Sequence, residues 1–224
     1  MATLAELRTL ILAKLEDGDI QNPTSAQVTD QINSTIDYYE TSEFWFGEDI
    51  ATLTATIGNP VLDISSVTDF YQEIQPNGLV VLESNVRYPL VKLTPLEYDT
   101  INVDSTGLPR WYTFRDSQFE LLFFPDQAYT VFLYYRKSYV DLVADGDTND
   151  FTINTPRLIE YKTLADVLRD YRSDFERAAV YEQKVVDELA QIKTQSYNRS
   201  ARGFLSTENI VDRGSKHNNY YFGY

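Results

Sequence analysis

The chain has 224 residues, 43% of them hydrophobic, with a formal net charge of -15 and no cysteine. This length and composition suffice for one or two buried cores. The lack of thiols excludes disulfides, thiolate catalysis and cysteine-ligated zinc. The acidic balance disfavours a surface that grips a phosphate backbone through clustered lysine and arginine.

No apolar run approaches the roughly 20 residues that a helix needs to cross a bilayer. The N-terminus also lacks the basic and apolar regions of a signal peptide. We therefore expect a chain with no membrane partner and no secretion signal.

The N-terminal region predicts two short amphipathic helices. Capping boxes, in which two residues three positions apart cap each other's backbone amides, begin at Thr3 and at Thr24. We expect the helices to end near Gly18 and Ser42. Apolar residues follow each box at helical spacing: Leu4, Leu7, Ile11 and Leu15, then Val28, Ile32, Ile36 and Tyr39.

Three consecutive aromatic residues, Phe44-Trp45-Phe46, follow the second helix. They fit either a buried cluster between the helical part and the next part, or an exposed anchor for a partner. We favour the buried cluster.

From Ile50 the hydrophobic period changes to two, which predicts strands. A turn at Gly58-Asn59-Pro60 suggests a hairpin between the strand that starts at Ile50 and the next one. The short spacing predicts an antiparallel sandwich or small barrel, interrupted by a brief helix around Pro95 to Ile101. The further strand candidates are Val61 to Ile64, Phe70 to Ile74, Leu79 to Leu82, Val86 to Leu90, Trp111 to Phe114, Phe119 to Phe124, and Tyr129 to Arg136.

Two further helices are predicted beyond the strands. Thr155-Pro156 is a typical helix start, and Ser173 with Glu176 forms a third capping box that begins another helix. The first of the two should bury Leu158, Tyr161, Ala165, Leu168 and Tyr171. The second should carry Phe175, Ala179, Val186, Leu189 and Ile192 on one side.

The expected fold is α+β, with a helical bundle formed by N-terminal and C-terminal helices, an antiparallel β-sandwich or small barrel, and an extended C-terminal arm. The predicted boundaries are 1–46 for the N-terminal helices, 47–150 for the β domain, 151–195 for the C-terminal helices and 196–224 for the arm.

The arm differs in charge from the rest of the chain. Four basic residues, Arg199, Arg202, Arg213 and Lys216, stand there against Glu208 and Asp212. A disordered terminus is one interpretation; an ordered arm laid on a neighbouring subunit or partner is the one we favour. The predicted interface residues are Arg199, Arg202, Phe204, Tyr220, Tyr221, Phe222 and Tyr224.

Candidate catalytic groups form no set in the sequence. The single histidine, His217, lies in the polar arm, and Asp145 to Asp150 departs from the calcium-loop pattern at its sixth and twelfth positions. We expect no catalytic residue, metal or cofactor. The alternatives are a carboxylate-based glycan hydrolase, with acid pairs such as Glu48-Asp49, or a carbohydrate-binding β module, in which Trp111 and Tyr112 would stack on sugars. Partial core packing is the favoured interpretation of those two aromatics.

A set of collinear strings resembles the tailed-bacteriophage adaptor, or head-to-tail connector, proteins. The resemblance covers most of the chain, from Leu4 to about Ile192. They are Ile32-Asn33-Ser34-Thr35-Ile36-Asp37-Tyr38-Tyr39-Glu40, Phe44-Trp45-Phe46, Arg87-Tyr88-Pro89-Leu90, Gly107-Leu108-Pro109, Phe124-Pro125-Asp126 with Tyr129, Tyr134-Tyr135, Pro156-Arg157-Leu158-Ile159-Glu160-Tyr161 and Asp174-Phe175-Glu176-Arg177-Ala178.

The resemblance implies a non-enzymatic virion protein at the head-tail interface, assembled in the host cytoplasm. It implies a ring of about twelve copies beneath the portal protein, closed by cyclic symmetry. Its further implied partners are a tail tube or nozzle protein and double-stranded DNA that passes through the lumen without specific binding. The helices would pack side by side in the ring, and an acidic channel wall would avoid lasting phosphate contacts.

Overall fold

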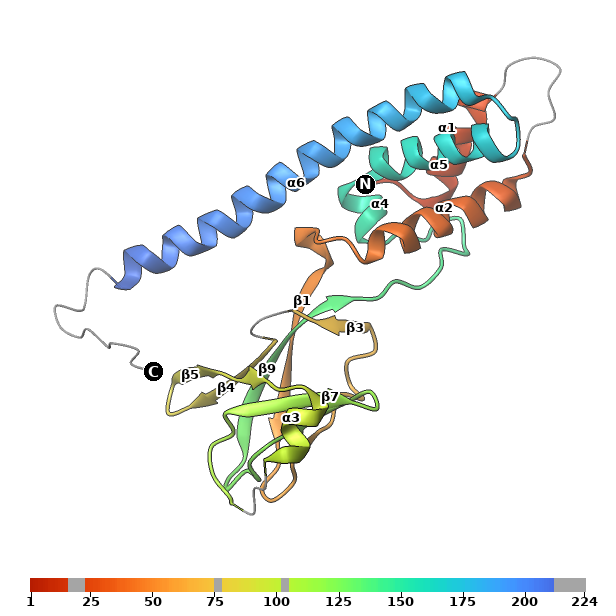
Figure 1. Cartoon of the computed structure of the whole chain (residues 1–224). Helices are drawn as coiled ribbons and strands as arrows, with labels where there is room; N and C mark the ends of the chain where they lie inside the picture. Colours follow the sequence, from red (N-terminus) through yellow and green to blue (C-terminus); the bar gives the residue numbers. More distant parts are fainter. Residues whose placement is uncertain (16–22, 75–77, 102–104, 212–224) are drawn as a thin grey trace. The chain divides into compact units, whose positions relative to one another are not determined.

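The computed structural model describes residues 1–15, 23–74, 78–101 and 105–211, with residues 200–211 described by their backbone alone. The chain divides into two compact units (Figure 1). The helical unit combines Met1–Phe46 with the part that follows Asp141, and the β unit is Gly47–Val140. The fold is α+β, as predicted.

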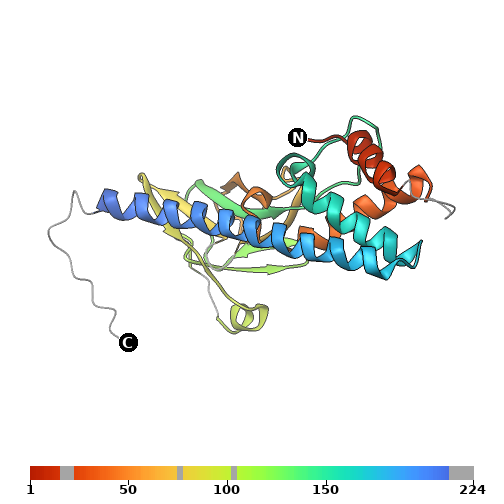
Figure 2. The ribbon, with the colours of Figure 1, turned by 90° about the horizontal axis from the view of Figure 1, so that it is seen from above.

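The helical unit is built around one central helix. It contains α1 (Leu4–Leu15), α2 (Ser25–Glu40), α4 (Asp150–Asn154), α5 (Pro156–Asp170) and α6 (Phe175–Val211). Helix α5 contacts each of the other four and is buried on most of its surface. In the view from above, α6 runs along one side of α5, and α1 lies on the other side (Figure 2). It buries apolar residues such as Leu164 and Val167, together with the acidic residues Glu160 and Asp166, which pair with Lys14 and Lys162.

Helix α1 is fixed at both ends. At its N-terminus the predicted capping box forms, because the Thr3 amide donates to Glu6 Oε2 at 2.9 Å and the Glu6 amide donates to Thr3 Oγ1 at 3.3 Å. At its C-terminus, Arg177 donates to the Lys14 carbonyl at 3.0 Å, and Arg172 donates to the Leu15 carbonyl. Arginines at this end satisfy carbonyls that lack helical partners and complement the helix dipole.

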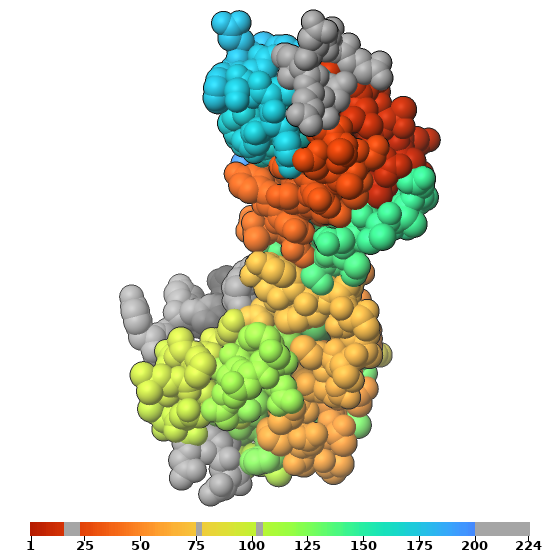
Figure 3. Space-filling model, turned by 90° about the vertical axis from the view of Figure 1, so that its right-hand side faces the viewer, coloured from red at the N-terminus to blue at the C-terminus, as the bar shows by residue number. Residues whose placement is uncertain are grey.

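The segment that follows Val140 belongs to the helical unit. The sequence-based boundary stood at residue 150; the β unit ends ten residues earlier because hydrogen bonds tie this segment to α1 and α2. The Ala5 amide donates to the Asp145 carbonyl at 3.1 Å, and the Asn33 side chain both donates to the Leu142 carbonyl and accepts from its amide. Figure 3 shows this green segment against the red and orange helices.

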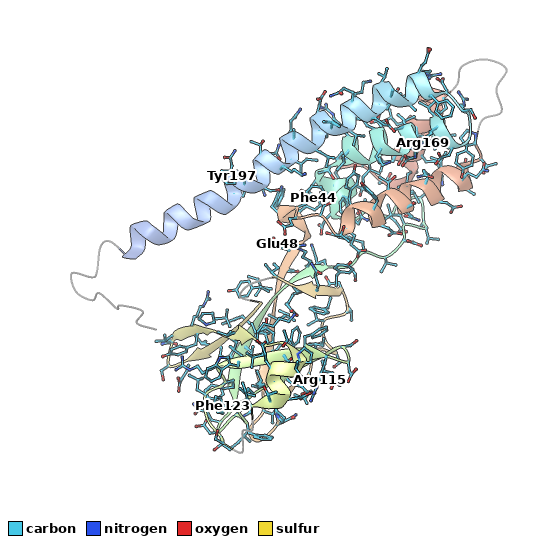
Figure 4. The ribbon with its side chains drawn as sticks, in the orientation of Figure 1. Phe44, Glu48, Arg115, Phe123, Arg169 and Tyr197 are labelled. Atoms are coloured by element: carbon cyan, nitrogen blue, oxygen red, sulfur yellow. The ribbon has the colours of Figure 1, made fainter. Side chains whose placement is uncertain are left out.

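Phe44 and Phe46 of the aromatic run after α2 are buried, as favoured from the sequence, but their cluster belongs to the helical unit and not to a junction with the β part. Phe44 and Phe46 are 2% and 5% exposed. Their ring centroids lie 6.0 and 5.2 Å from that of Phe151, which comes from α4. The cluster lies inside the helical unit, where Figure 4 labels Phe44. It joins the end of the N-terminal helices to the start of the C-terminal ones.

The β unit consists of two sheets. The first has the order β1-β9-β4-β5, with β3 also paired to β9, and the second has the order β2-β8-β7-β6. Buried residues of both sheets form one core around Val131, Leu133, Tyr112 and Phe119. The strands are β1 (Glu48–Ala55), β2 (Val61–Leu62), β3 (Phe70–Glu73), β4 (Leu79–Glu83), β5 (Val86–Pro89), β6 (Val91–Lys92), β7 (Trp111–Arg115), β8 (Gln118–Leu121) and β9 (Tyr129–Lys137).

Two strand pairings differ from the prediction. Gly58, at φ +69°, does form a turn, but β1 pairs with β9 and β2 pairs with β8, so the turn connects the two sheets instead of closing a hairpin. The pair β6–β7 is parallel, whereas the other pairs of named strands are antiparallel. The predicted short helix, α3 (Pro95–Thr100), lies in the connection between those two strands.

The C-terminal helix α6 is longer than predicted. It extends to Val211, so the first part of the expected extended arm, from residue 196, is helical; residues 212–224 lie outside the described range. The chain does break at Ser173, which has φ +53°. The predicted cap at Ser173 is wrong, because Asp174 accepts the Arg177 amide at 3.1 Å. Among the residues described, no helix is both long and apolar enough to cross a membrane.

Truncating Phe151 tests the aromatic cluster. The Phe151→Ala substitution should lower the free energy of unfolding by about 3 to 5 kcal/mol, because a buried ring is lost and a cavity remains. Denaturant unfolding measures the change. The control is Phe175→Ala, a 65% exposed residue, for which we expect a change within about 0.5 kcal/mol. Equal losses in the two variants would contradict the assignment of the core.

Tyr39 gives a pH-dependent prediction. Burial, then the charges of Tyr38 and Asp166, raise the pKa of Tyr39 from 10.0 to about 12. Because folding opposes its ionisation, the stability that Tyr39 contributes is complete below pH 10 and is lost as the pH rises towards 12. Tyr39→Phe should therefore lose less unfolding free energy than the wild type over this window. If Tyr39→Phe and the exposed control Tyr197→Phe follow the wild-type curve equally, the account of Tyr39 is wrong.

Candidate functional site

The predicted interface residues fall into three groups, according to how much of each residue the structure describes. Arg199 is described with its side chain, whereas Arg202 and Phe204 lie on the α6 backbone, with side chains outside the described set. The four aromatic residues predicted as partner anchors, Tyr220, Tyr221, Phe222 and Tyr224, lie outside the described residues, as does His217. The structure therefore places one of the predicted side chains, and its contacts are within the helical unit.

Arg199 holds the middle of α6 against the aromatic run. Its guanidinium lies over the Trp45 ring, 3.3 Å from the ring centroid, and the Trp45 amide donates to Ser196 Oγ at 3.4 Å. A guanidinium stacked on an indole is a favourable cation–π contact. The sequence analysis identified neither Ser196 nor Trp45 as a partner of the helix, because 151 residues separate Trp45 from Ser196.

Helix α6 packs on α5 along a narrow seam. Its buried residues, Ala178, Val185 and Ile192, recur every seven positions and lie on one side of the helix. One hydrogen bond and one aromatic contact flank them. Arg169 of α5 donates to Glu182 at 3.2 Å, and the rings of Tyr161 and Tyr181 have centroids 6.2 Å apart. A repeat of seven is the pattern that keeps one side of a helix on its neighbour.

A second apolar stripe on α6 has no partner within the described residues. Phe175, Val186 and Tyr197 are 65%, 58% and 73% exposed. Figure 4 labels Tyr197 on α6. They recur every eleven positions, and the exposed residues Ala179 and Ala190 lie between them with the same interval. We call these five residues the α6 ridge. With 3.6 residues per turn, the ridge lies roughly 110° around the helix from the seam.

The ridge corrects one sequence prediction. Phe175, Ala179 and Val186 were expected on the same side of the helix as Leu189 and Ile192. The structure instead buries Ile192 in the seam and leaves Leu189 half-buried at its edge. Phe175, Ala179 and Val186 are exposed. The eleven-residue recurrence of Phe175, Val186 and Tyr197 was the available signal for a second stripe.

Helix α1 carries a shallow apolar depression on its outer face. Ala5, Glu6, Thr9, Leu10 and Ala13 line it. All five project away from Leu4, Leu7, Ile11 and Leu15, the residues that α1 buries. Leu10 is 42% exposed. We call this depression the α1 groove.

The acidic residues considered for calcium are engaged within the protein. Asp145 forms an ion pair with Arg8 at 2.7 Å, and Asp147 accepts from the amides of Val143 and Ala144 at 2.8 and 2.7 Å. These two backbone hydrogen bonds lower the pKa of Asp147. Across the described residues, no three histidine, cysteine or acidic side chains gather as metal ligands.

The residues of the carbohydrate and hydrolase alternatives also have structural positions. Tyr112 is fully buried, and half-buried Trp111 packs against Phe123 with ring centroids 5.5 Å apart, as favoured from the sequence. Glu48 and Asp49 are adjacent residues of β1. Adjacent side chains of a strand point to opposite faces of the sheet, so these two carboxylates cannot flank one bond.

Comparison with known proteins identifies the family. A family model described as SU10 adaptor protein matches residues 2–206. No curated protein matches the chain. The match extends over both units and most of α6, and the family is one of structural phage proteins, not of enzymes. The chain therefore belongs to the SU10 adaptor protein family and is a structural adaptor of a bacteriophage virion.

Proposed function

We propose that this protein forms an adaptor ring that connects the portal vertex of the phage head to the tail. The ring holds about twelve copies, closed by head-to-tail contacts between neighbouring subunits. It sits at the head-tail interface of the virion and assembles in the host cytoplasm. The observation that carries the proposal is the adaptor-family match across residues 2–206, collinear with the strings noted in the sequence.

The partners in this proposal are the portal protein on one side and a tail tube or nozzle protein on the other. Double-stranded DNA passes through the lumen as a passenger during ejection. The formal charge of -15 supports this role, because an acidic wall makes no lasting contacts with phosphates. The protein does no chemistry on the DNA and uses no cofactor.

The C-terminal region supplies a second contact in the proposal. Arg202 and Phe204 extend the helix beyond the Arg199–Trp45 contact, and the aromatic residues Tyr220, Tyr221, Phe222 and Tyr224 act as anchors on the portal protein. Arginine and aromatic residues are the types that contribute most to protein interfaces. The basic character of residues 196–224 suits an acidic neighbour.

Imaging tests the adaptor function. Purified chain mixed with portal vertices of the same phage should give rings coaxial with the portal in negative stain, whereas portal vertices alone should show no such layer. A chain that remains single and unbound beside intact portal vertices would contradict the proposal. Turnover of a glycan abolished by changing a single acid pair would contradict it as well.

Truncation tests the C-terminal contact. A chain that ends at Tyr197 should lose at least about tenfold in portal affinity. Its unfolding midpoint should fall only modestly, because the truncation removes the Arg199–Trp45 contact but keeps the buried seam through Ile192. A chain that ends at Val211 serves as the matched control and separates the helix from the terminal aromatics. Unchanged portal affinity in the shorter chain would refute the role of the arm.

A further inference from the structure

The α6 ridge is an exposed apolar surface of unusual length. From Phe175 to Tyr197 it extends about 33 Å along the helix. Lys193, which is exposed, lies on the same side, and Glu182 at the edge of the ridge pairs with Arg169 of α5 in the same copy. Scattered exposed apolar residues are ordinary, but three large apolar residues that recur along one side of a charged helix mark an interaction surface. Large residues alternate with alanines along it, so it forms separate knobs.

The α1 groove has the complementary character. Small residues, Ala5, Thr9 and Ala13, form its floor, so another helix can approach the α1 backbone closely. Its single charged residue is Glu6, which is opposite in sign to Lys193 of the ridge. The groove extends about 12 Å from Ala5 to Ala13, so it can take the part of the ridge around Val186 and Ala190, with Lys193 near Glu6.

The two surfaces cannot meet within one copy. They lie on helices on opposite sides of α5, and both are exposed (Figure 2). Contact between two different surfaces of two identical chains is heterologous, and its repetition closes a ring or extends a filament. A two-fold contact of ridge against ridge would instead stop at a dimer and would bring two Lys193 residues towards each other.

We propose that the α6 ridge of one copy docks in the α1 groove of the next copy. This inference rests on the proposed function, since it names the surfaces through which the ring closes. Val186 and Ala190 lie across the small residues of α1, and Lys193 pairs with Glu6 of the neighbour. The seam of Ala178, Val185 and Ile192 stays within each copy and keeps the ridge in place.

The cysteine-free chain permits a clean crosslinking test. One variant carries Ala190→Cys in the ridge and another carries Ala13→Cys in the groove; both alanines are exposed. Each variant is assembled with portal vertices, alone or mixed with the other, and treated with a bis-maleimide. The mixture should give a crosslinked dimer, and each variant alone should not. A dimer from Ala190→Cys alone would establish a two-fold contact and overturn the proposal, as would no dimer from the mixture.

Two matched valines test the energetics. Val186 of the ridge is 58% exposed, and Val180, on another side of the same helix, is 57% exposed. Added to Ala190→Cys, Val186→Lys should lower the yield of crosslinked dimer about tenfold or more, because it buries a lysine in an apolar contact. Val180→Lys should leave the yield unchanged. Lysine favours helix formation, so neither substitution should unfold α6. Equal yields from the two variants would overturn the proposal.

The outcomes separate the two levels of the account. If the wild-type chain forms rings on portal vertices but Val186→Lys assembles normally, the ridge-and-groove contact is wrong and the adaptor function stands. If the wild-type chain forms no rings there, the proposed function fails and the contact fails with it.

Discussion

The packing of α6 on α5 through Ala178, Val185 and Ile192 determines what the helical unit can offer to other molecules. A seven-residue repeat holds one side of a helix and leaves the rest of its circumference free. The Arg199–Trp45 contact and the Arg169–Glu182 ion pair fix the helix against rotation about its own axis. The ridge therefore has one defined orientation within the helical unit. A ridge on a helix free to rotate would give an interface no fixed geometry.

The same reasoning applies to α1, a short helix of 12 residues. Helices of this length are marginal in isolation, so its order depends on its ends and its buried side. The segment around Asp145 binds the first amides, and two arginines from the start of α6 and the turn before it bind the last carbonyls. The elements that present the groove and the ridge are thus linked through one bundle. In a ring built on these surfaces, α5 would fix the position of the groove relative to the ridge in each copy, because it contacts both α1 and α6.

Local signals predicted the elements well, because their causes are local. The Thr3–Glu6 box depends on residues three apart, and the alternation after Ile50 marks a half-buried strand wherever its partner lies. Partner choice is not local: the Gly58 turn predicted a hairpin, but β9, more than seventy residues later, pairs with β1. The error on α6 has a similar cause. Two apolar stripes on one helix look alike in sequence, and only the position of α5 decides which one is buried. The candidate contact surfaces could not be predicted for the same reason, since Trp45 meets Ser196 only after folding.

The central claim is that copies of this chain join edge to edge through the α6 ridge and the α1 groove. A reconstruction of the chain assembled on portal vertices, at a resolution that shows helices, tests it most directly. The account predicts that the α6 segment around Val186 and Ala190 lies against α1 of the adjacent copy around the whole ring. A map in which that side of α6 faces the lumen, the solvent or α6 of a two-fold partner would contradict it.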